Sequence, residues 1–170
     1  WALTGRHQAR NAAAAAALAV AIGIPPETIA AGVVHARLPG MRSKVTRLDG
    51  VTYVNDAYNA NPGSMRAALA NLAEFADPAR LVLVLGEMRE LGGSEAAEHR
   101  ALVENALQTF PGVRLLTVGR AFGECPGALR FDRSEEVGET LAKLVRDGDL
   151  VFAKGSRGIA VELALPEAAR

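Results

Sequence analysis

The sequence predicts an α/β fold, with a Rossmann-like, mostly parallel sheet, an antiparallel hairpin at one edge and two helices in front of it. Continuous apolar runs such as Leu81–Leu85 are typical of strands that are buried on both faces. These runs alternate with segments of helical periodicity, which requires crossover connections and therefore parallel strands. Asp49-Gly50 lies between two runs of strand-forming residues and indicates a hairpin.

Two helices are expected at the start of the chain. The alanine-rich segment predicts a helix from about Gln8 to Ile22 that ends before Pro25-Pro26, and a second helix continues to His35. The alanine-rich segment is too short to span a bilayer, and no small-residue cleavage site leads into a mature domain. We therefore expect a buried helix rather than a membrane span or a signal peptide.

The elements of the sheet follow in order. Hairpin strands are expected at Lys44–Leu48 and Val51–Val54. Asn61 is a good N-cap and Pro62 a good first residue for a helix that runs to Phe75. After the Leu81–Leu85 strand we expect a helix capped by Ser94, strands at Leu115–Val118 and Ala128–Phe131, a helix ending at Val145, a strand at Leu150–Ala153 and a final helix.

The composition excludes several classes of function. The 170 residues carry 19 basic and 19 acidic side chains, and this balance argues against binding to nucleic acid or to a membrane surface. Cys125 is the only cysteine, which excludes an internal disulfide, and we expect an inert thiol in a loop. The three histidines lack ligand spacing, so no metal site is predicted, and we expect His35 and His99 to be surface or capping residues.

The candidate site consists of polar loops that follow strands. Because parallel strands end at one edge of a sheet, their loops converge in the crevice where open α/β proteins bind ligands. Four such loops are expected to meet, at Asn55–Asn61, Gly86–Gly92, Gly119-Arg120 and Lys154–Gly158. Their acids and cations suit an anionic or zwitterionic small ligand. No phosphate-binding loop and no dinucleotide fingerprint is present.

Each loop also has a simpler interpretation. Asn61 is explained by a helix cap alone, and Glu87 and Arg89 are explained by a mutual ion pair on a solvated loop. Lys154–Gly158 is explained by a flexible turn. The shared edge of the sheet favours a site, because scattered surface polarity would not collect there.

Four segments of the chain resemble the Mur ligases. Gly5–Ala13 resembles the segment that closes the central ATPase domain of this family. Asn55–Leu69, Gly86–Gly92 with the downstream His99, and Lys154–Gly158 are similar to segments of the member that adds a D-alanyl-D-alanine dipeptide. Four motifs in this order are highly specific, and the resemblance spans nearly the whole chain.

The resemblance implies an ATP- and magnesium-dependent ligase. The family phosphorylates a substrate carboxylate to an acyl phosphate, which the incoming amine then attacks. Residues 1–38 would be the last helices of the central ATP-binding domain, and residues 39–170 the closing domain. The expected partners are UDP-N-acetylmuramoyl-tripeptide, D-alanyl-D-alanine and the missing N-terminal and central domains. The expected location is cytoplasmic, with the magnesium ligands upstream of Trp1 and no activity in this fragment alone.

The resemblance also assigns site residues. Asn11 would contact the adenine of ATP, Arg42 its phosphates and Asp56 its ribose hydroxyls. No catalytic residue and no metal ligand is expected within the chain. Gln8 replaces an asparagine of the family pattern, and Lys44 replaces an acidic residue that would orient the arginine. The pocket for the dipeptide or its acceptor would be lined by Tyr58, Asn59, Asn61, Lys154, Ser156 and Arg157.

Two alternatives remain open. Another Mur ligase or a relative of folylpolyglutamate synthetase would share the closing domain, although the Tyr58–Pro62 string favours the dipeptide-adding member. A non-catalytic nucleotide-binding or scaffolding module is the second alternative. The first two helices distinguish it, because a ligase fragment would leave an apolar face uncovered there and a self-sufficient module would not.

Overall fold

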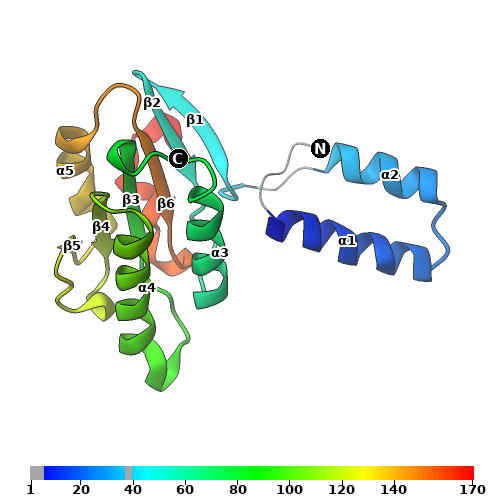
Figure 1. Cartoon of the computed structure of the whole chain (residues 1–170), viewed down its shortest axis with the longest axis horizontal. Coiled ribbons are helices and arrows are strands. Elements are labelled where there is room, and N and C mark those ends of the chain that lie inside the picture. The colour runs from blue at the N-terminus through cyan, green and yellow to red at the C-terminus, as the bar shows by residue number, and fades with distance from the viewer. Residues whose placement is uncertain (1–5, 37–39) are drawn as a thin grey trace. The chain divides into compact units, whose positions relative to one another are not determined.

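The computed structural model describes residues 6–36 and 40–170, which belong to two separate compact units. In the first unit, helices α1 (Arg6–Ala21) and α2 (Pro26–His35) form a hairpin, as predicted (Figure 1). The expected burial of the first helix is wrong, because Leu18 and Val20 are 66% and 61% exposed. Within the described residues no helix is long and apolar enough to cross a membrane. Leu38 and Pro39, at the predicted domain boundary, lie outside the described residues.

The second unit is built on a six-stranded sheet (Figure 1). The strands are β1 (Lys44–Leu48), β2 (Val51–Asn55), β3 (Leu81–Gly86), β4 (Arg114–Val118), β5 (Ala128–Phe131) and β6 (Leu150–Lys154). Their order is β1-β2-β6-β3-β4-β5, with β1 and β2 antiparallel and every other neighbouring pair parallel. The predicted fold class is therefore confirmed. Asp49 and Gly50 both have positive φ, of 49° and 75°, as a tight hairpin turn requires.

Helices cover both faces of this sheet. On one face α3 (Pro62–Leu72) and α4 (Glu95–Thr109) pack together, and α5 (Val137–Leu144) lies on the other (Figure 1). The side chains of β3 alternate between these layers, with Leu83 and Leu85 in the first core and Val82 and Val84 in the second. All of β3 is buried, which explains its unbroken apolar run.

The predicted N-terminal cap of α3 by Asn61 is confirmed, whereas the predicted side-chain cap of α4 by Ser94 is wrong. The Asn61 side chain accepts a hydrogen bond from the Ser64 N–H at 2.8 Å, and the Ser64 hydroxyl accepts one from the Asn61 N–H at 3.0 Å. Pro62 follows as the first residue of the helix. Ser94 makes no such bond, because its hydroxyl donates backwards to the Leu91 carbonyl at 2.9 Å.

The predicted final helix is wrong. After β6 the chain forms three short 3₁₀ segments, Arg157–Ile159, Val161–Ala164 and Glu167–Ala169. Ala160 separates the first two with a φ of 53°, a left-handed conformation that ends a helix. Pro166 lacks the N–H that a continued helix would need.

Candidate functional site

Asp56 and Lys154 meet at the edge of the sheet where the parallel strands end. Asp56 directly follows β2 and Lys154 is the last residue of β6, and these two strands are neighbours in the sheet. The Lys154 Nζ lies 2.7 Å from the Asp56 Oδ2, and the two side chains are 6% and 18% exposed. The same ammonium group donates to the Asn59 carbonyl at 3.0 Å. One cation therefore connects the loop after β2 with the end of β6.

Arg42 and Tyr58 bring the start of the second unit to the same place. The Arg42 guanidinium carbon lies 4.1 Å from the centre of the Tyr58 ring, in a cation–π contact. The Ser43 N–H donates to the Asp56 Oδ1 at 3.0 Å. Lys44 stands where the family pattern has an acidic residue to orient the arginine, and in this structure Arg42 is in contact with an aromatic ring. Lys44 donates instead to the Arg170 carbonyl.

Ser156 joins three of the predicted loops. Its N–H donates to the Glu87 carbonyl at 2.9 Å, and its hydroxyl accepts from the Arg89 N–H at 2.9 Å. The hydroxyl also donates to the Ala60 carbonyl at 3.2 Å. The proposed ion pair between Glu87 and Arg89 is absent from the described contacts, since the Glu87 carboxylate accepts from the Ala121 N–H at 2.5 Å. The loop after β4 is thereby tied to the same cluster.

Two buried polar side chains, Glu162 and Asn55, were given no individual role by the sequence analysis. Glu162, 8% exposed, holds Arg157 through an Oε1–Nη1 contact of 2.6 Å. It lies in the segment that was predicted as a regular helix, so no signal marked it. Asn55 is fully buried, and its Nδ2 has no partner among the described residues. The sequence analysis named Asn55 as the first residue of a candidate loop, and its place at the carboxyl end of β2 is the signal for that.

Four other residues that the sequence analysis singled out lie outside the loop cluster. Asn11 is exposed on α1 in the first unit, whereas the other predicted site residues belong to the second unit. Cys125 donates to the Phe122 carbonyl, and burial raises the pKa of its thiol, which fits an inert group. His35 is exposed as expected, but His99 is fully buried, so that expectation is wrong. The described residues contain no His, Cys, Asp and Glu cluster able to hold a metal ion.

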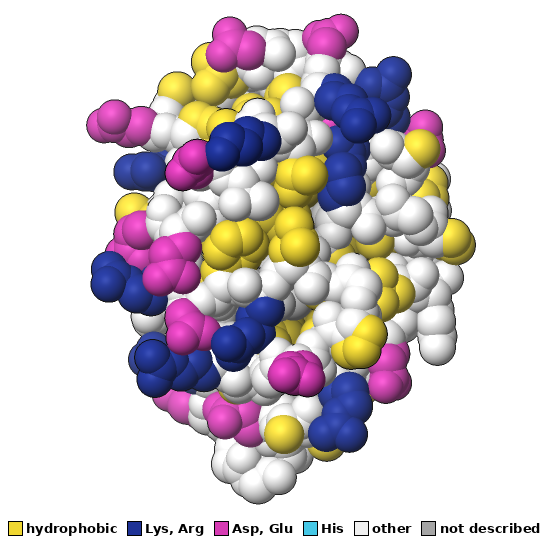
Figure 2. Space-filling view, turned by 90° about the vertical axis from the view of Figure 1, so that its left-hand side faces the viewer, with side chains coloured by type: hydrophobic (Ala, Val, Ile, Leu, Met, Phe, Trp, Pro, Cys, Tyr) yellow, Lys and Arg dark blue, Asp and Glu magenta, His cyan; other side chains and the backbone are white. Residues whose placement is uncertain are grey.

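A charged pocket of about 470 Å³ opens beside the cluster, outside the ends of β3 and β4. Arginines and acids both line it, and one side view of the molecule shows charges of both signs interspersed around apolar side chains (Figure 2). Its charged lining residues are Glu87, Arg89, Arg120, Asp132, Arg133 and Glu135. Both charge signs are therefore available to a zwitterionic ligand, as the sequence predicts.

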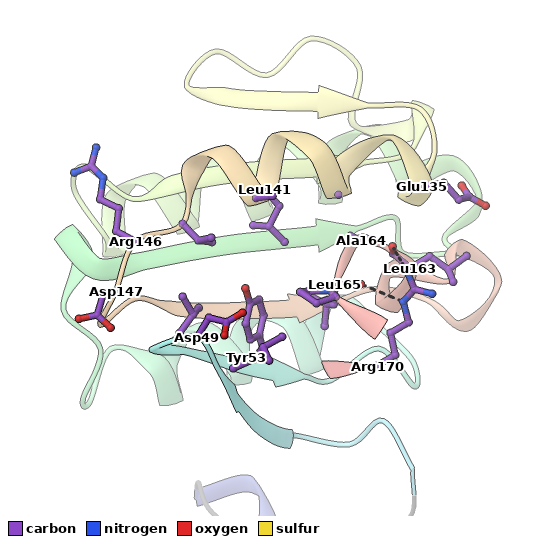
Figure 3. Close-up of a pocket in the computed structure, with 16 residues that line it drawn as sticks. Asp49, Tyr53, Glu135, Leu141, Arg146, Asp147, Leu163, Ala164, Leu165 and Arg170 are labelled. Atoms are coloured by element: carbon purple, nitrogen blue, oxygen red, sulfur yellow. Dashed lines mark hydrogen bonds between the residues drawn. The ribbon is translucent and has the colours of Figure 1, made fainter. Parts of the chain in front are cut away.

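A pocket of about 580 Å³ lies on the α5 face and is lined mainly by apolar side chains (Figure 3). The Tyr53 ring reaches into it, and burial, with Asp49 nearby, raises the pKa of the Tyr53 hydroxyl. None of the predicted site residues lines this pocket. The larger hollow is therefore not where the polar loops converge, and the loop cluster is the better candidate site.

Comparison with known proteins identifies relatives over nearly the whole chain. Residues 41–157 match the family described as Mur ligase, glutamate ligase domain. The chain is 36% identical over 176 residues to the UDP-N-acetylmuramoyl-tripeptide–D-alanyl-D-alanine ligase of Treponema pallidum, covering 96% of the chain and 37% of that protein. The chain thus spans little more than a third of this relative.

Two solved structures are similar to this one. MurF from Acinetobacter baumannii has a TM-score of 0.80 at 30% identity, covering 94% of this chain and 36% of that one. The MurF ligase from Thermotoga maritima in complex with ADP has a TM-score of 0.77 at 25% identity, covering 95% of this chain and 37% of that one. Sequence match and fold agree, and the chain belongs to the Mur ligase family.

Proposed function

We propose that the protein containing this chain is an ATP-dependent ligase that joins D-alanyl-D-alanine to UDP-N-acetylmuramoyl-tripeptide, in the cytoplasmic synthesis of peptidoglycan precursors. Residues 39–170 supply its closing domain, and residues 1–38 the last helices of its central ATP-binding domain. The observation that carries the proposal is the cluster at the sheet edge, where Lys154 bonds Asp56 and Ser156 joins two further loops. These loops carry the segments that resemble the dipeptide-adding member.

The nucleotide side of the proposed site consists of Asn11, Arg42 and Asp56. Each oxygen of a carboxylate has two lone pairs, so the Asp56 carboxylate keeps acceptor capacity for ribose hydroxyls beside its bonds to Lys154 and Ser43. The Arg42 guanidinium group lies over the Tyr58 ring, and its planar fork of N–H donors suits phosphate oxygens. The residues present therefore fit a nucleotide.

On the substrate side of the proposed site, three residues would contact the substrate and three others hold the loops in place. Lys154 and Arg157 are the cations of this side, each paired with an acid of the chain, and they would face a carboxylate of the dipeptide or acceptor. Tyr58 is 45% exposed. The other three residues shape the loops: Asn61 caps α3, the Asn59 side chain accepts from the Ala60 N–H, and Ser156 is 4% exposed.

The chemistry of this proposal needs a second half-site. Phosphorylation of a carboxylate and attack by an amine require groups positioned on both sides of a closed cleft. The proposed magnesium ligands belong to that other half, because Asp56 is already engaged by Lys154 and the described residues offer no cluster of metal ligands. The exposed Leu18, Val20 and Val34 of α1 and α2 support this division, since uncovered apolar side chains are expected of a part of a larger enzyme.

Turnover by the longer protein tests the proposal. We expect release of ADP and phosphate, and formation of a UDP-muramyl pentapeptide by mass spectrometry, when D-alanyl-D-alanine, UDP-muramyl tripeptide, ATP and Mg²⁺ are all supplied. Single amino acids in place of the dipeptide should give no product, and neither should the 170-residue chain alone. Turnover with a single amino acid and not with the dipeptide would favour another Mur ligase. If turnover depends on neither the dipeptide nor a single amino acid, the proposed ligase activity is rejected.

A further inference from the structure

His99 is held by two backbone groups of opposite kind. It lies in the first turns of α4 and is fully buried. Its Nε2 is 2.9 Å from the Met88 backbone nitrogen, and its Nδ1 is 2.7 Å from the Glu95 carbonyl oxygen. A backbone N–H only donates and a carbonyl only accepts, so these partners assign the proton to Nδ1 and the lone pair to Nε2.

The bond to Met88 lies directly behind the cluster at the sheet edge. Met88 lies between Glu87 and Arg89, and the backbone groups of these two residues form hydrogen bonds with Ser156. Ser156 in turn donates to the Ala60 carbonyl. One hydrogen bond from α4 therefore holds Met88, the middle residue of segment 87–89, and this segment bonds the loop that contains Ser156.

Regular structure does not supply this support. The strand β3 ends at Gly86, so the Met88 N–H lies beyond the ladder of the sheet. The Phe122 ring stands edge-on against the His99 ring, with centroids 4.7 Å apart and an interplanar angle of 77°. This contact limits rotation of the imidazole and links it to the loop after β4. His99 therefore touches two of the converging loops from a helix that is not itself part of the site.

We propose that His99 is a positioning residue for the dipeptide side of the site. It sets the backbone of residues 87–89 and, through Ser156, the arrangement of the loops that we propose to receive D-alanyl-D-alanine. It contacts no substrate. The inference rests on the proposed function for its kinetic consequence, whereas its structural consequence is independent of that function.

Variants at His99 can show whether the hydrogen-bond acceptor that it offers to the Met88 N–H matters, or only the space that its side chain fills. Gln places its side-chain oxygen near the position of the imidazole Nε2, whereas Asn reaches only the position of Nδ1. His99→Gln should therefore keep the bond to the Met88 N–H, and His99→Asn and His99→Leu should lose it. Val103→Ala is the matched control, because Val103 is 4% exposed on the same helix and makes no polar contact with the loops.

Kinetics of the longer protein test the role. In His99→Asn and His99→Leu we expect KM for D-alanyl-D-alanine to rise about tenfold, the effect of one unsatisfied buried N–H. KM for ATP should stay within about twofold, and His99→Gln should resemble the wild type. A merely structural role would lower kcat in all core variants, Val103→Ala included, without this change in dipeptide KM. That result, or a His99→Gln protein as impaired as His99→Asn, would overturn the proposal.

Amide exchange in the 170-residue chain gives a second, independent result. We expect the Met88 and Ser156 N–H groups to exchange faster in His99→Asn than in His99→Gln or Val103→Ala. Unchanged protection at Met88 would overturn the proposal even if the longer protein is active. If the wild-type longer protein shows no dipeptide-dependent turnover, the proposed function fails, and amide exchange still decides whether His99 positions the loop.

Discussion

Replacing Lys154 by methionine tests whether its ion pair with Asp56 holds the loops together. The two side chains are 6% and 18% exposed and their charged atoms lie 2.7 Å apart. Loss of one partner of a buried pair costs about 3–5 kcal/mol. Asp56 would keep its partial exposure and the Ser43 N–H, so we expect a loss of about 2–3 kcal/mol in the free energy of unfolding.

The chain contains a matched control for this prediction. Lys143 and Glu139 on α5 form a pair at a similar distance, 2.6 Å, but are 73% and 82% exposed. Double-mutant cycles with Lys→Met and with Asp56→Asn or Glu139→Gln isolate the coupling in each pair. We expect a coupling of about 1.5 kcal/mol or more for the buried pair and at most about 0.5 kcal/mol for the exposed one.

Urea denaturation measures both couplings. The two tyrosines, Tyr53 and Tyr58, lie in the second unit, so near-ultraviolet circular dichroism in the tyrosine band, read in a Trp1→Phe background because tryptophan absorbs in the same region, follows that unit. With a slope of about 2 kcal/mol per molar urea, Lys154→Met should lower the midpoint by about 1 M or more. A coupling between Lys154 and Asp56 no larger than that between Lys143 and Glu139 would refute the reasoning.

Asn61→Ala removes the cap of α3 and should lower the free energy of unfolding by about 1 kcal/mol; an unchanged urea midpoint would contradict this. Burial of Asp149 is outweighed by the Arg114 guanidinium and the Arg146 N–H, which hold the pKa of its carboxyl below its usual range. A depressed pKa stabilises the fold above the unfolded-state value of about 3.9, and this contribution is lost as the pH falls through the folded-state value. The stability difference between wild type and Asp149→Asn should therefore shrink on acidification below about pH 4 in urea titrations, and a constant difference would disprove the assignment. In the longer protein, Asp56→Ala should raise KM for ATP more than KM for D-alanyl-D-alanine, and the opposite pattern would move Asp56 to the substrate pocket.

The fold was predictable where local pattern and burial agree. The unbroken run of β3 and the Asp49-Gly50 turn each specify one structure, and both are present. The insertion of β6 between β2 and β3 pairs strands that are far apart in the sequence, which no local pattern encodes. The last segment misled the prediction, because the left-handed backbone at Ala160 belongs to a residue that favours helices.

The candidate site was predictable as a set of loops but not as a set of contacts. Asp56 and Lys154 are 98 residues apart, and only the parallel sheet places them together. The contact of Arg42 with Tyr58 could not be predicted, because cation–π geometry leaves no spacing pattern. His99 does belong to a spacing pattern, because the buried residues of α4 recur at helical spacing, namely His99, Leu102, Val103 and Ala106. Its buried position could therefore have been predicted.

Hydrogen–deuterium exchange in the longer protein, with and without ADP and D-alanyl-D-alanine, tests the central claim most directly. If the ligands bind where the strand ends converge, peptides covering residues 55–61, 86–92 and 154–158 should exchange more slowly in their presence. Protection confined to residues 138–147 and 163–166, around the pocket on the α5 face, would contradict the account.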